Sequence, residues 1–300
     1  MTSTHPRQLT NPPSETELAG LARDGATVLR GVLDLSWIES MRAAIEHALE
    51  SPSPLSREYT STGNSGRYFG DFFLWRRDDA FRAFMADSPL PELAALLMKS
   101  ENAFFFYDQL LVKEPGTREE TPLHHDLPYW PVRGEQIISI WVPFDLATPE
   151  SGAVTYVRGS HRWGKMYSPA AFGAGGGYDK TYAATGFEPI PDLERDIDPA
   201  DHLAWSLQPG DVLVHHPLTL HFARGNASAE HRRRGLALRY VGDDAVYDDH
   251  PGTFLESPQM KAELPDLGLQ DGEPFRGELF PQVWPRLNEQ DASSPPPERQ

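Results

Sequence analysis

Cysteine is absent from this 300-residue sequence. Without it the chain cannot contain a disulfide framework, a thiolate zinc site or a cysteine nucleophile. Basic residues are few, 27 Lys and Arg against 44 Asp and Glu, and a net charge of −17 argues against a nucleic-acid partner. No apolar run is long enough to span a bilayer, and the first residues lack the apolar stretch of a signal peptide. We therefore expect no nucleic-acid ligand, no membrane association and a cytoplasmic location.

Aromatic residues, proline and glycine are plentiful instead. With 15 Phe, 10 Tyr and 7 Trp, the chain can build a sizeable core, while 28 Pro and 24 Gly predict many turns. Strand-like runs occupy residues 103–107, 110–112, 137–142, 154–157, 212–215 and 236–241. Short strands that follow a mostly helical beginning predict a mainly β fold with flanking α-helices, a β-sandwich or jelly roll.

Helices are predicted in the first third of the chain. Ser14 with Glu17, and Ser36 with Glu39, each fit a capping box, in which a hydroxyl and a carboxylate satisfy the first backbone N–H groups. Two further helices are expected at 78–85 and 89–98, and the Ser/Pro/Gly-rich residues 51–70 are expected to form a loop.

The predicted organisation is one catalytic domain with two loose ends. Residues 1–13 are expected to be a flexible N-terminal arm, residues 14–290 a single jelly-roll domain, and residues 291–300 a disordered tail. Within the domain we expect a helical N-terminal part at 14–100, a β core at 101–242, a lid insertion at 162–205 and a C-terminal wrap at 243–290.

A histidine and an aspartate lie two residues apart in the segment Thr121–Trp130. On an extended strand, side chains at i and i+2 point to the same face, so His124 and Asp126 could reach one metal ion. Two histidines, one carboxylate and open positions are the ligand set of non-haem Fe(II) oxygenases. A polar edge strand also produces such a pair by chance, so the interpretation depends on a third ligand elsewhere.

Three histidines in the segment 210–221 could supply that ligand. His215 and His216 end an apolar strand, where a packed or hydrogen-bonded histidine is the simpler interpretation. His221 precedes a predicted turn, from which it could point into the mouth of a barrel. We choose His221, so the predicted catalytic and metal-binding set is His124, Asp126 and His221.

Three consecutive arginines enter the strand that follows. They could form a solvated basic cluster, or one guanidinium could clamp a carboxylate in a bidentate manner, as the dicarboxylate 2-oxoglutarate would require. Alternation places Arg233 in phase with Arg239, and Arg232 in phase with Arg234. Periodicity does not decide which set faces inward.

In combination, these motifs resemble the phytanoyl-CoA dioxygenase family of Fe(II)/2-oxoglutarate-dependent oxygenases. The resemblance covers about residues 15–245, with matching segments at 24–33, 109–113, 121–126, 141, 151–152, 158–161, 210–221, 226 and 232–235. It implies a double-stranded β-helix (cupin-like jelly roll), iron at His124, Asp126 and His221, and O2 as cosubstrate. It also implies that Arg232 or Arg233 binds 2-oxoglutarate. Spacing from His221 favours Arg232, the arginine pair before a small residue favours Arg233, and we favour Arg233.

The resemblance adds weaker candidates. Gln109, Trp141 and Lys113 match positions near the cosubstrate, although a strand Trp is often core and strand polarity is ordinary. His125 stands where glutamine is common in the family, and it should point away from the iron. Asp126 is retained, which favours hydroxylation over halogenation.

The predicted function is the hydroxylation, or another oxidation, of an unactivated C–H bond in a small molecule, with release of succinate and CO2. A secondary metabolite is expected. The acidic stretch 243–249 could attract an amine-bearing one, although a solvated loop is the simpler interpretation of such a run of charges. Two alternatives are a cupin-like metal-dependent dioxygenase or isomerase that does not use 2-oxoglutarate, and a non-catalytic ligand-binding jelly roll. No feature of the sequence indicates an oligomeric state.

Overall fold

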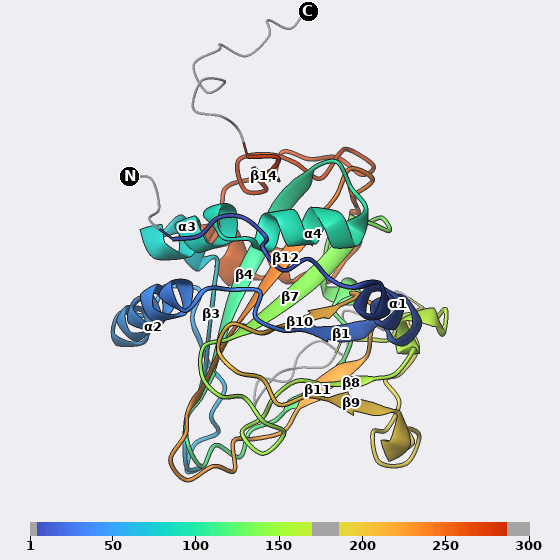
Figure 1. Ribbon diagram of the computed structural model, residues 1–300. Coiled ribbons are helices and arrows are strands. Elements are labelled where there is room, and N and C mark those ends of the chain that lie inside the picture. The colour runs from blue at the N-terminus through green and yellow to red at the C-terminus, as the bar shows by residue number, and fades with distance from the viewer. Residues whose placement is uncertain (1–4, 170–185, 287–300) are drawn as a thin grey trace, which may run out of the picture.

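The computed structural model describes residues 5–169 and 186–286, and its centre is a pair of antiparallel β-sheets (Figure 1). The strands of the larger sheet are, in spatial order, β1 (Ala26–Leu29), β10 (Val212–His215), β7 (Ile137–Pro143), β12 (Arg233–Val241), β4 (Ala103–Lys113), β3 (Tyr68–Phe72) and β2 (Arg57–Glu58), with β14 (Gln282–Trp284) paired to β4. The smaller sheet has the order β5 (Thr121–His124), β11 (His221–Ala223), β8 (Thr155–Val157) and β9 (His202–Ala204). A separate pair joins β13 (Val246–Tyr247) to β6 (Val132–Arg133).

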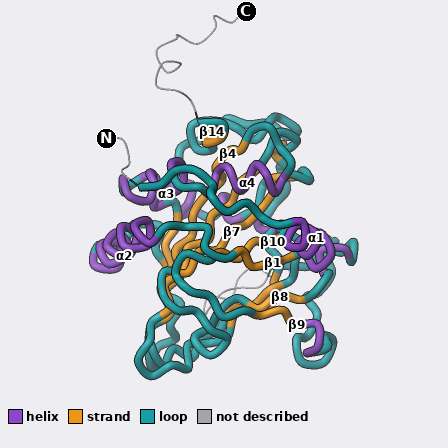
Figure 2. Tube along the Cα trace, in the orientation of Figure 1, coloured by secondary structure: helices purple, strands orange, loops and turns teal. Residues whose placement is uncertain are grey.

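Helices cover one side of the larger sheet. The α-helices are α1 (Glu15–Asp24), α2 (Leu35–Glu50), α3 (Asp79–Asp87), α4 (Leu90–Met98) and α6 (Pro258–Glu263). Single 3₁₀ turns are η1 (Leu74–Arg76), η2 (Leu127–Tyr129), η3 (Ser160–Arg162), η4 (Pro199–Asp201) and η5 (Phe254–Glu256). Figure 2 shows α2, α3 and α4 gathered beside the larger sheet, away from β8 and β9. Apolar residues of these three helices share one core cluster with the sheet.

Alternation along β7 and β12 separates the helix-facing side chains from the interior. Ile138, Ile140, Val142, Leu236, Leu238 and Tyr240 belong to the core shared with the helices. Trp141 and Ala237 instead pack with Tyr156 of the smaller sheet, between the two sheets. Because Arg233 lies in phase with Ala237, alternation points Arg233 into this interior and Arg232 away from it. The structure therefore decides the question that periodicity left open.

Most predicted elements are present, with some corrections. The capping box of Ser14 and Glu17 caps α1, and the runs 103–107 and 110–112 are one continuous strand, β4. The prediction that Ser36 caps the second helix is wrong, because α2 begins at Leu35 and the Asp34 carboxylate accepts the N–H of Ser36. The predicted loop at 51–70 contains β2 and the beginning of β3.

The two ends and the predicted lid are covered only in part. Of the expected arm, the carbonyl of Pro6 accepts the indole N–H of Trp37 at 2.7 Å. Residues 170–185 of the expected lid and the expected tail at 291–300 lie outside the described residues. Among the helices of the described part, none is long and apolar enough to cross a membrane.

Candidate active site

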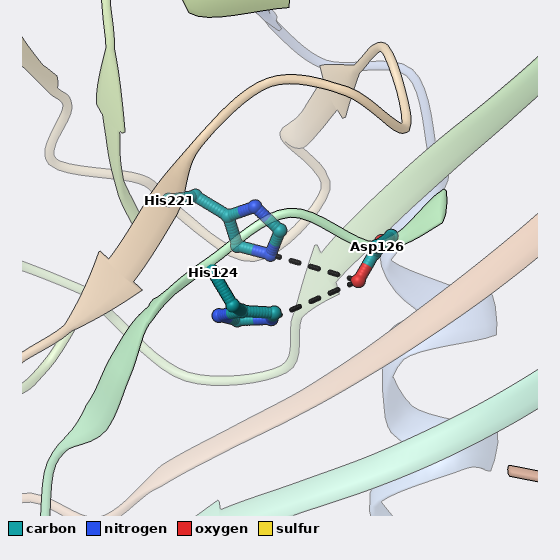
Figure 3. A group of neighbouring side chains, drawn as sticks. All are labelled: His124, Asp126 and His221. Carbon is teal, nitrogen blue, oxygen red and sulfur yellow. Dashed lines mark ion pairs between the residues drawn. The ribbon is translucent and has the colours of Figure 1, made fainter. Parts of the chain in front are cut away.

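Three buried side chains converge between the two sheets (Figure 3). Asp126 Oδ1 lies 3.7 Å from His124 Nε2 and 3.9 Å from His221 Nε2, and the three ligand atoms all lie within 4.8 Å of one another. Two atoms that each bind one ion at about 2.1 Å can be at most about 4.2 Å apart. Both distances to Asp126 meet this limit, so small side-chain rotations would let the three atoms share one metal ion.

Strand pairing brings the two histidines together. His124 is the last residue of β5 and His221 the first residue of β11, and they are direct partners in the antiparallel ladder. The two-residue spacing suggested that Asp126 lies on the strand with His124, but it does not. Asp126 is the residue immediately before the turn η2 and has helical dihedral angles (φ −76°, ψ −39°). The turn expected directly after His221 is likewise strand, since β11 extends to Ala223.

Backbone carbonyls fix the orientation of both imidazoles. Nδ1 of His124 lies 2.8 Å from the carbonyl of Pro122, and Nδ1 of His221 lies 2.9 Å from the carbonyl of Thr219. A carbonyl only accepts, so each Nδ1 carries the proton and each Nε2 presents its lone pair toward Asp126. Metal-binding histidines are generally oriented by such a bond from the other ring nitrogen.

The charges of the site suit a divalent cation. Burial lowers the pKa of His124 and holds the pKa of His221 well below its usual value, so both are neutral at neutral pH. Burial alone would raise the pKa of Asp126, but the hydrogen bond with His215 and the positive charge of Arg239 hold it well below its usual range. Two neutral imidazoles and one carboxylate are the protonation states that metal binding requires.

The neighbouring histidines have other partners. His215 is buried, and its Nε2 lies 3.2 Å from Asp126 Oδ2, which fits the hydrogen-bonded role expected from the sequence. His125 Nε2 accepts the backbone N–H of Tyr167 at 2.9 Å, so the ring points away from the metal ligands, as expected. His216 Nδ1 accepts the backbone N–H of Leu218 at 3.1 Å.

A small inner cavity adjoins His124 and His221, two of the three candidate ligands. It is lined by His124, His215, His221, Arg233, Arg239, Trp141, Gln109, Tyr68, Thr121, Leu111, Val154, Phe222, Ala223 and Ala237. Three buried N–H groups on this lining, Nε1 of Trp141 and Nε of Arg233 and Arg239, have no acceptor among the described residues. Buried polar groups are nearly always hydrogen-bonded, so these donors indicate a place for an anionic ligand.

The two candidate arginines have different surroundings. Arg233 is 2% exposed, and its Nη1 donates to the carbonyl of Leu111 at 3.0 Å. No Asp or Glu within residues 5–169 and 186–286 forms an ion pair with it. Arg232 is part-exposed and pairs with Glu46 and Glu114 at 2.7 and 2.6 Å. The structure therefore brings Arg233 to the cavity and places Arg232 outside it.

Of the three weaker candidates for cosubstrate binding, two line the inner cavity and one does not. Trp141 and Gln109 line the inner cavity, and Gln109 Oε1 accepts from Arg239 Nη2 at 3.1 Å. Lys113 does not line it, because its Nζ donates to the carbonyls of residues 223 and 224 at 3.2 and 2.7 Å. Gly235 makes room for the indole, since a Cβ there would lie 2.3 Å from Cζ2 of Trp141.

The comparison with known proteins agrees with this geometry. The sequence profile described as phytanoyl-CoA dioxygenase (PhyH) matches residues 21–235. The chain belongs to the PhyH family. The family predicted from the sequence is confirmed, and with it the enzyme class, a non-haem Fe(II)/2-oxoglutarate-dependent dioxygenase. No curated protein matches this PhyH-family chain in a sequence search.

Several solved structures resemble this PhyH-family protein. The α-ketoglutarate-dependent epimerase SnoN from nogalamycin biosynthesis is 23% identical, with 90% of this chain and 97% of that chain covered and a TM-score of 0.69. The carbocyclase SnoK from the same biosynthesis is 22% identical (91% and 99% covered, TM-score 0.67). EctD from S. alaskensis, with 2-oxoglutarate and 5-hydroxyectoine, is 19% identical (90% and 88% covered, TM-score 0.62). Likeness at these identities shows the fold, and the predicted cupin-like jelly roll is confirmed.

A larger outer cavity of about 440 Å³ lies beside His124 and Asp126 of this PhyH-family chain. Its lining is Arg57, Glu58, Tyr59, Phe72, Tyr107, Gln109, His124, Asp126, Tyr129, Trp130, Phe254, Ser257 and Met260. Gln109 and His124 line both cavities, so the two adjoin. Residues 162–169 and 186–205, the described parts of the predicted lid, line neither cavity. Arg239 and the outer lining from 57–59 and 254–260 were not predicted from the sequence.

Proposed function

We propose that the protein uses Fe(II), 2-oxoglutarate and O2 to oxidise a C–H bond of a small molecule, with hydroxylation as the main outcome. His124, Asp126 and His221 would hold the iron, and Arg233 would bind the far carboxylate of 2-oxoglutarate. When bound, the metal and the keto acid supply the oxidising chemistry, while the protein supplies orientation and a dry site.

One observation carries the cosubstrate assignment. The Arg233 guanidinium is buried, has no acidic partner among the described residues and lines a cavity that also contains two of the three ligand side chains. A buried charge is costly unless an opposite charge pairs with it. A dicarboxylate that reaches from the metal ligands to Arg233 would provide that charge and accept the unpaired N–H groups of Trp141 and Arg239. An enzyme that does not use 2-oxoglutarate, the alternative weighed above, would leave these groups unpaired.

The outer cavity suits a small substrate with a flat apolar part. Its volume of about 440 Å³ lies within the usual range of small-molecule pockets, about 300–1,000 Å³. Six of its lining residues are aromatic: Tyr59, Phe72, Tyr107, Tyr129, Trp130 and Phe254. Relatives named from nogalamycin biosynthesis support a secondary metabolite. Those relatives are an epimerase and a carbocyclase, so hydroxylation is proposed from the retained Asp126 rather than from them.

Two carboxylates of the acidic stretch 243–249 bind backbone N–H groups, so this stretch does not support an amine-bearing substrate. Asp243 accepts the N–H groups of Glu101 and Asn102, and Asp244 accepts those of Glu135 and Gln136. These carboxylates hold neighbouring loops in place. Recognition of an amine would depend on Glu58, the exposed acidic residue of the outer lining. The cytoplasmic location stays a prediction.

Conversion of 2-oxoglutarate to succinate tests this proposal. The protein would be loaded anaerobically with Fe(II), then given 2-oxoglutarate and air, and succinate would be measured by NMR. We expect succinate that requires both iron and the cosubstrate, and at least about a hundredfold less from Asp126→Ala, since one metal ligand is lost. Equal succinate from wild type and this variant would contradict the proposed iron site.

A further inference from the structure

Three donor residues lie in one row across the larger sheet, directly beside Asp126. His215 of β10 is the ladder partner of Ser139 of β7, and Ser139 is in turn the ladder partner of Arg239 of β12. Side chains at paired positions share a face of the sheet, so these three lie side by side in the interior. We propose that this row holds one oxygen of Asp126 away from the metal, so that Asp126 binds iron through the other oxygen alone. The inference rests on the proposed function.

The two oxygens of Asp126 have different neighbours. Oδ2 lies 3.1 Å from Ser139 Oγ, 3.2 Å from His215 Nε2 and 4.0 Å from Arg239 Nη2. Oδ1 instead faces the Nε2 atoms of His124 and His221 at 3.7 and 3.9 Å. One oxygen is thus surrounded by donors and the other by the metal-binding nitrogens.

The donors are themselves held in place. His215 Nδ1 lies 3.2 Å from the hydroxyl of Tyr156, a buried residue of the smaller sheet. Arg239 donates to Gln109 and stacks 4.5 Å above the ring of Tyr107. Ser139, His215 and Arg239 are all at most 5% exposed, so water cannot readily replace Asp126 as their acceptor. Rotation of Oδ2 toward a metal would therefore leave buried donors without a partner.

The way in which Asp126 binds a metal ion would decide how many coordination positions stay open for the cosubstrates. Two histidines and one carboxylate oxygen leave three positions on an octahedral ion. The 2-oxoglutarate and O2 of the proposed function would need these positions. A carboxylate can also bind through both oxygens, which would take one of these three positions. The row of Ser139, His215 and Arg239 is thus a set of positioning residues that keeps Asp126 from competing with the cosubstrates.

The test compares ligand binding in the whole protein. Ser139→Ala/His215→Phe removes the two donors within hydrogen-bond distance, His215→Gln keeps an amide donor, and His216→Phe changes the adjacent histidine, which does not contact Asp126. Fe(II) and then 2-oxoglutarate would be titrated anaerobically, with visible absorption and magnetic circular dichroism as readouts of coordination. Thermal unfolding of the metal-free variants would check the fold.

We expect the double variant to bind Fe(II) as the wild type does, but to bind 2-oxoglutarate at least about tenfold more weakly, because loss of a hydrogen bond to a charged group has about that effect. His215→Gln should restore most of the affinity, and His216→Phe should match the wild type. Unchanged 2-oxoglutarate affinity and an unchanged spectrum in the double variant would overturn the inference, as would an equal loss in His216→Phe. If the double variant does not fold, Ser139→Ala alone is judged by the same criteria. Failure of the wild type to bind iron and 2-oxoglutarate would instead contradict the proposed function.

Discussion

Replacement of Arg233 by glutamine separates the role of this residue in binding from any role in stability. In the absence of cosubstrate its guanidinium is a buried charge with one backbone acceptor and no acidic partner among the described residues. Arg233→Gln removes that charge and leaves a shorter, neutral polar side chain. The metal-free variant should therefore be at least as stable as the wild type, since buried unpaired charge disfavours folding.

The cost should appear in 2-oxoglutarate binding. A hydrogen bond to a charged group contributes about 1.5–3 kcal/mol, and about 1.4 kcal/mol corresponds to a tenfold change in affinity. Loss of the Arg233 contact therefore predicts about 10- to 150-fold weaker binding of 2-oxoglutarate, with Fe(II) binding unchanged because Arg233 is not among the three ligands.

Arg232→Gln is the matched control. Arg232 makes part-exposed ion pairs with Glu46 and Glu114, and such pairs contribute about 0–1 kcal/mol to stability. Isothermal titration of both iron-loaded variants with 2-oxoglutarate under nitrogen compares the two residues directly. If Arg232→Gln weakens binding and Arg233→Gln does not, the assignment of the arginine is refuted.

Three further perturbations probe the same site and its surroundings. Gly235→Ala would place a methyl group 2.3 Å from the Trp141 ring, so we expect about 1–3 kcal/mol lower stability in chemical denaturation together with weaker 2-oxoglutarate binding. The control is Gly20→Ala, where the nearest side-chain atom is 3.8 Å away, and it should show neither change. A fully stable Gly235→Ala protein would count against the close packing of Gly235 and Trp141. Burial lowers the pKa of His125 from 6.5 to about 4, so the folded state resists protonation of this residue. The stability of the folded protein should therefore fall as the pH drops from about 6.5 toward 4, by about 3 kcal/mol from His125. His125→Gln should flatten that dependence, and an equally steep profile in the variant would exclude His125 as its source. Fe(II) at about 100 times its dissociation constant should stabilise the wild type by about 2.7 kcal/mol in thermal unfolding, and removal of the iron by a chelator should reverse this stabilisation. His221→Ala should not be stabilised by Fe(II). Stabilisation of that variant would argue against His221 as a metal ligand.

The cluster of His124, Asp126 and His221 could be proposed from the sequence because its residue types are unusual and two of its members lie close together in the chain. The chemistry of His124 and Asp126 is visible in three residues of sequence, even though strand alternation was the wrong reason for their proximity. Asp126 reaches His124 from a turn, and His221 reaches it across a ladder. Residue types therefore pointed to this cluster better than the assumed local geometry did.

Periodicity alone could not identify the inward arginine, because alternation defines two faces and does not say which one is covered; only the family resemblance favoured Arg233. The answer depends on the helices that pack against Leu236 and Leu238 and leave Arg233 on the other side. Arg239 could have been found by the same alternation once Arg233 was placed. The error at Ser36 has a local cause, since Asp34 is an equally good N-cap two residues earlier.

The outer cavity had no local signal in the sequence. Its lining combines residues 57–59, 129–130 and 254–260, which the fold brings together from distant parts of the chain. Aromatic residues such as Trp130 and Phe254 look like ordinary core residues until the surrounding elements are in place.

Anaerobic titration of the metal-free protein with Fe(II), followed by 2-oxoglutarate, tests the central claim most directly. We predict one iron per chain and a visible charge-transfer band that develops when the keto acid is added, with both lost in His221→Ala. Absence of stoichiometric iron in the wild type, or the same band in His221→Ala, would contradict a site made of His124, Asp126 and His221.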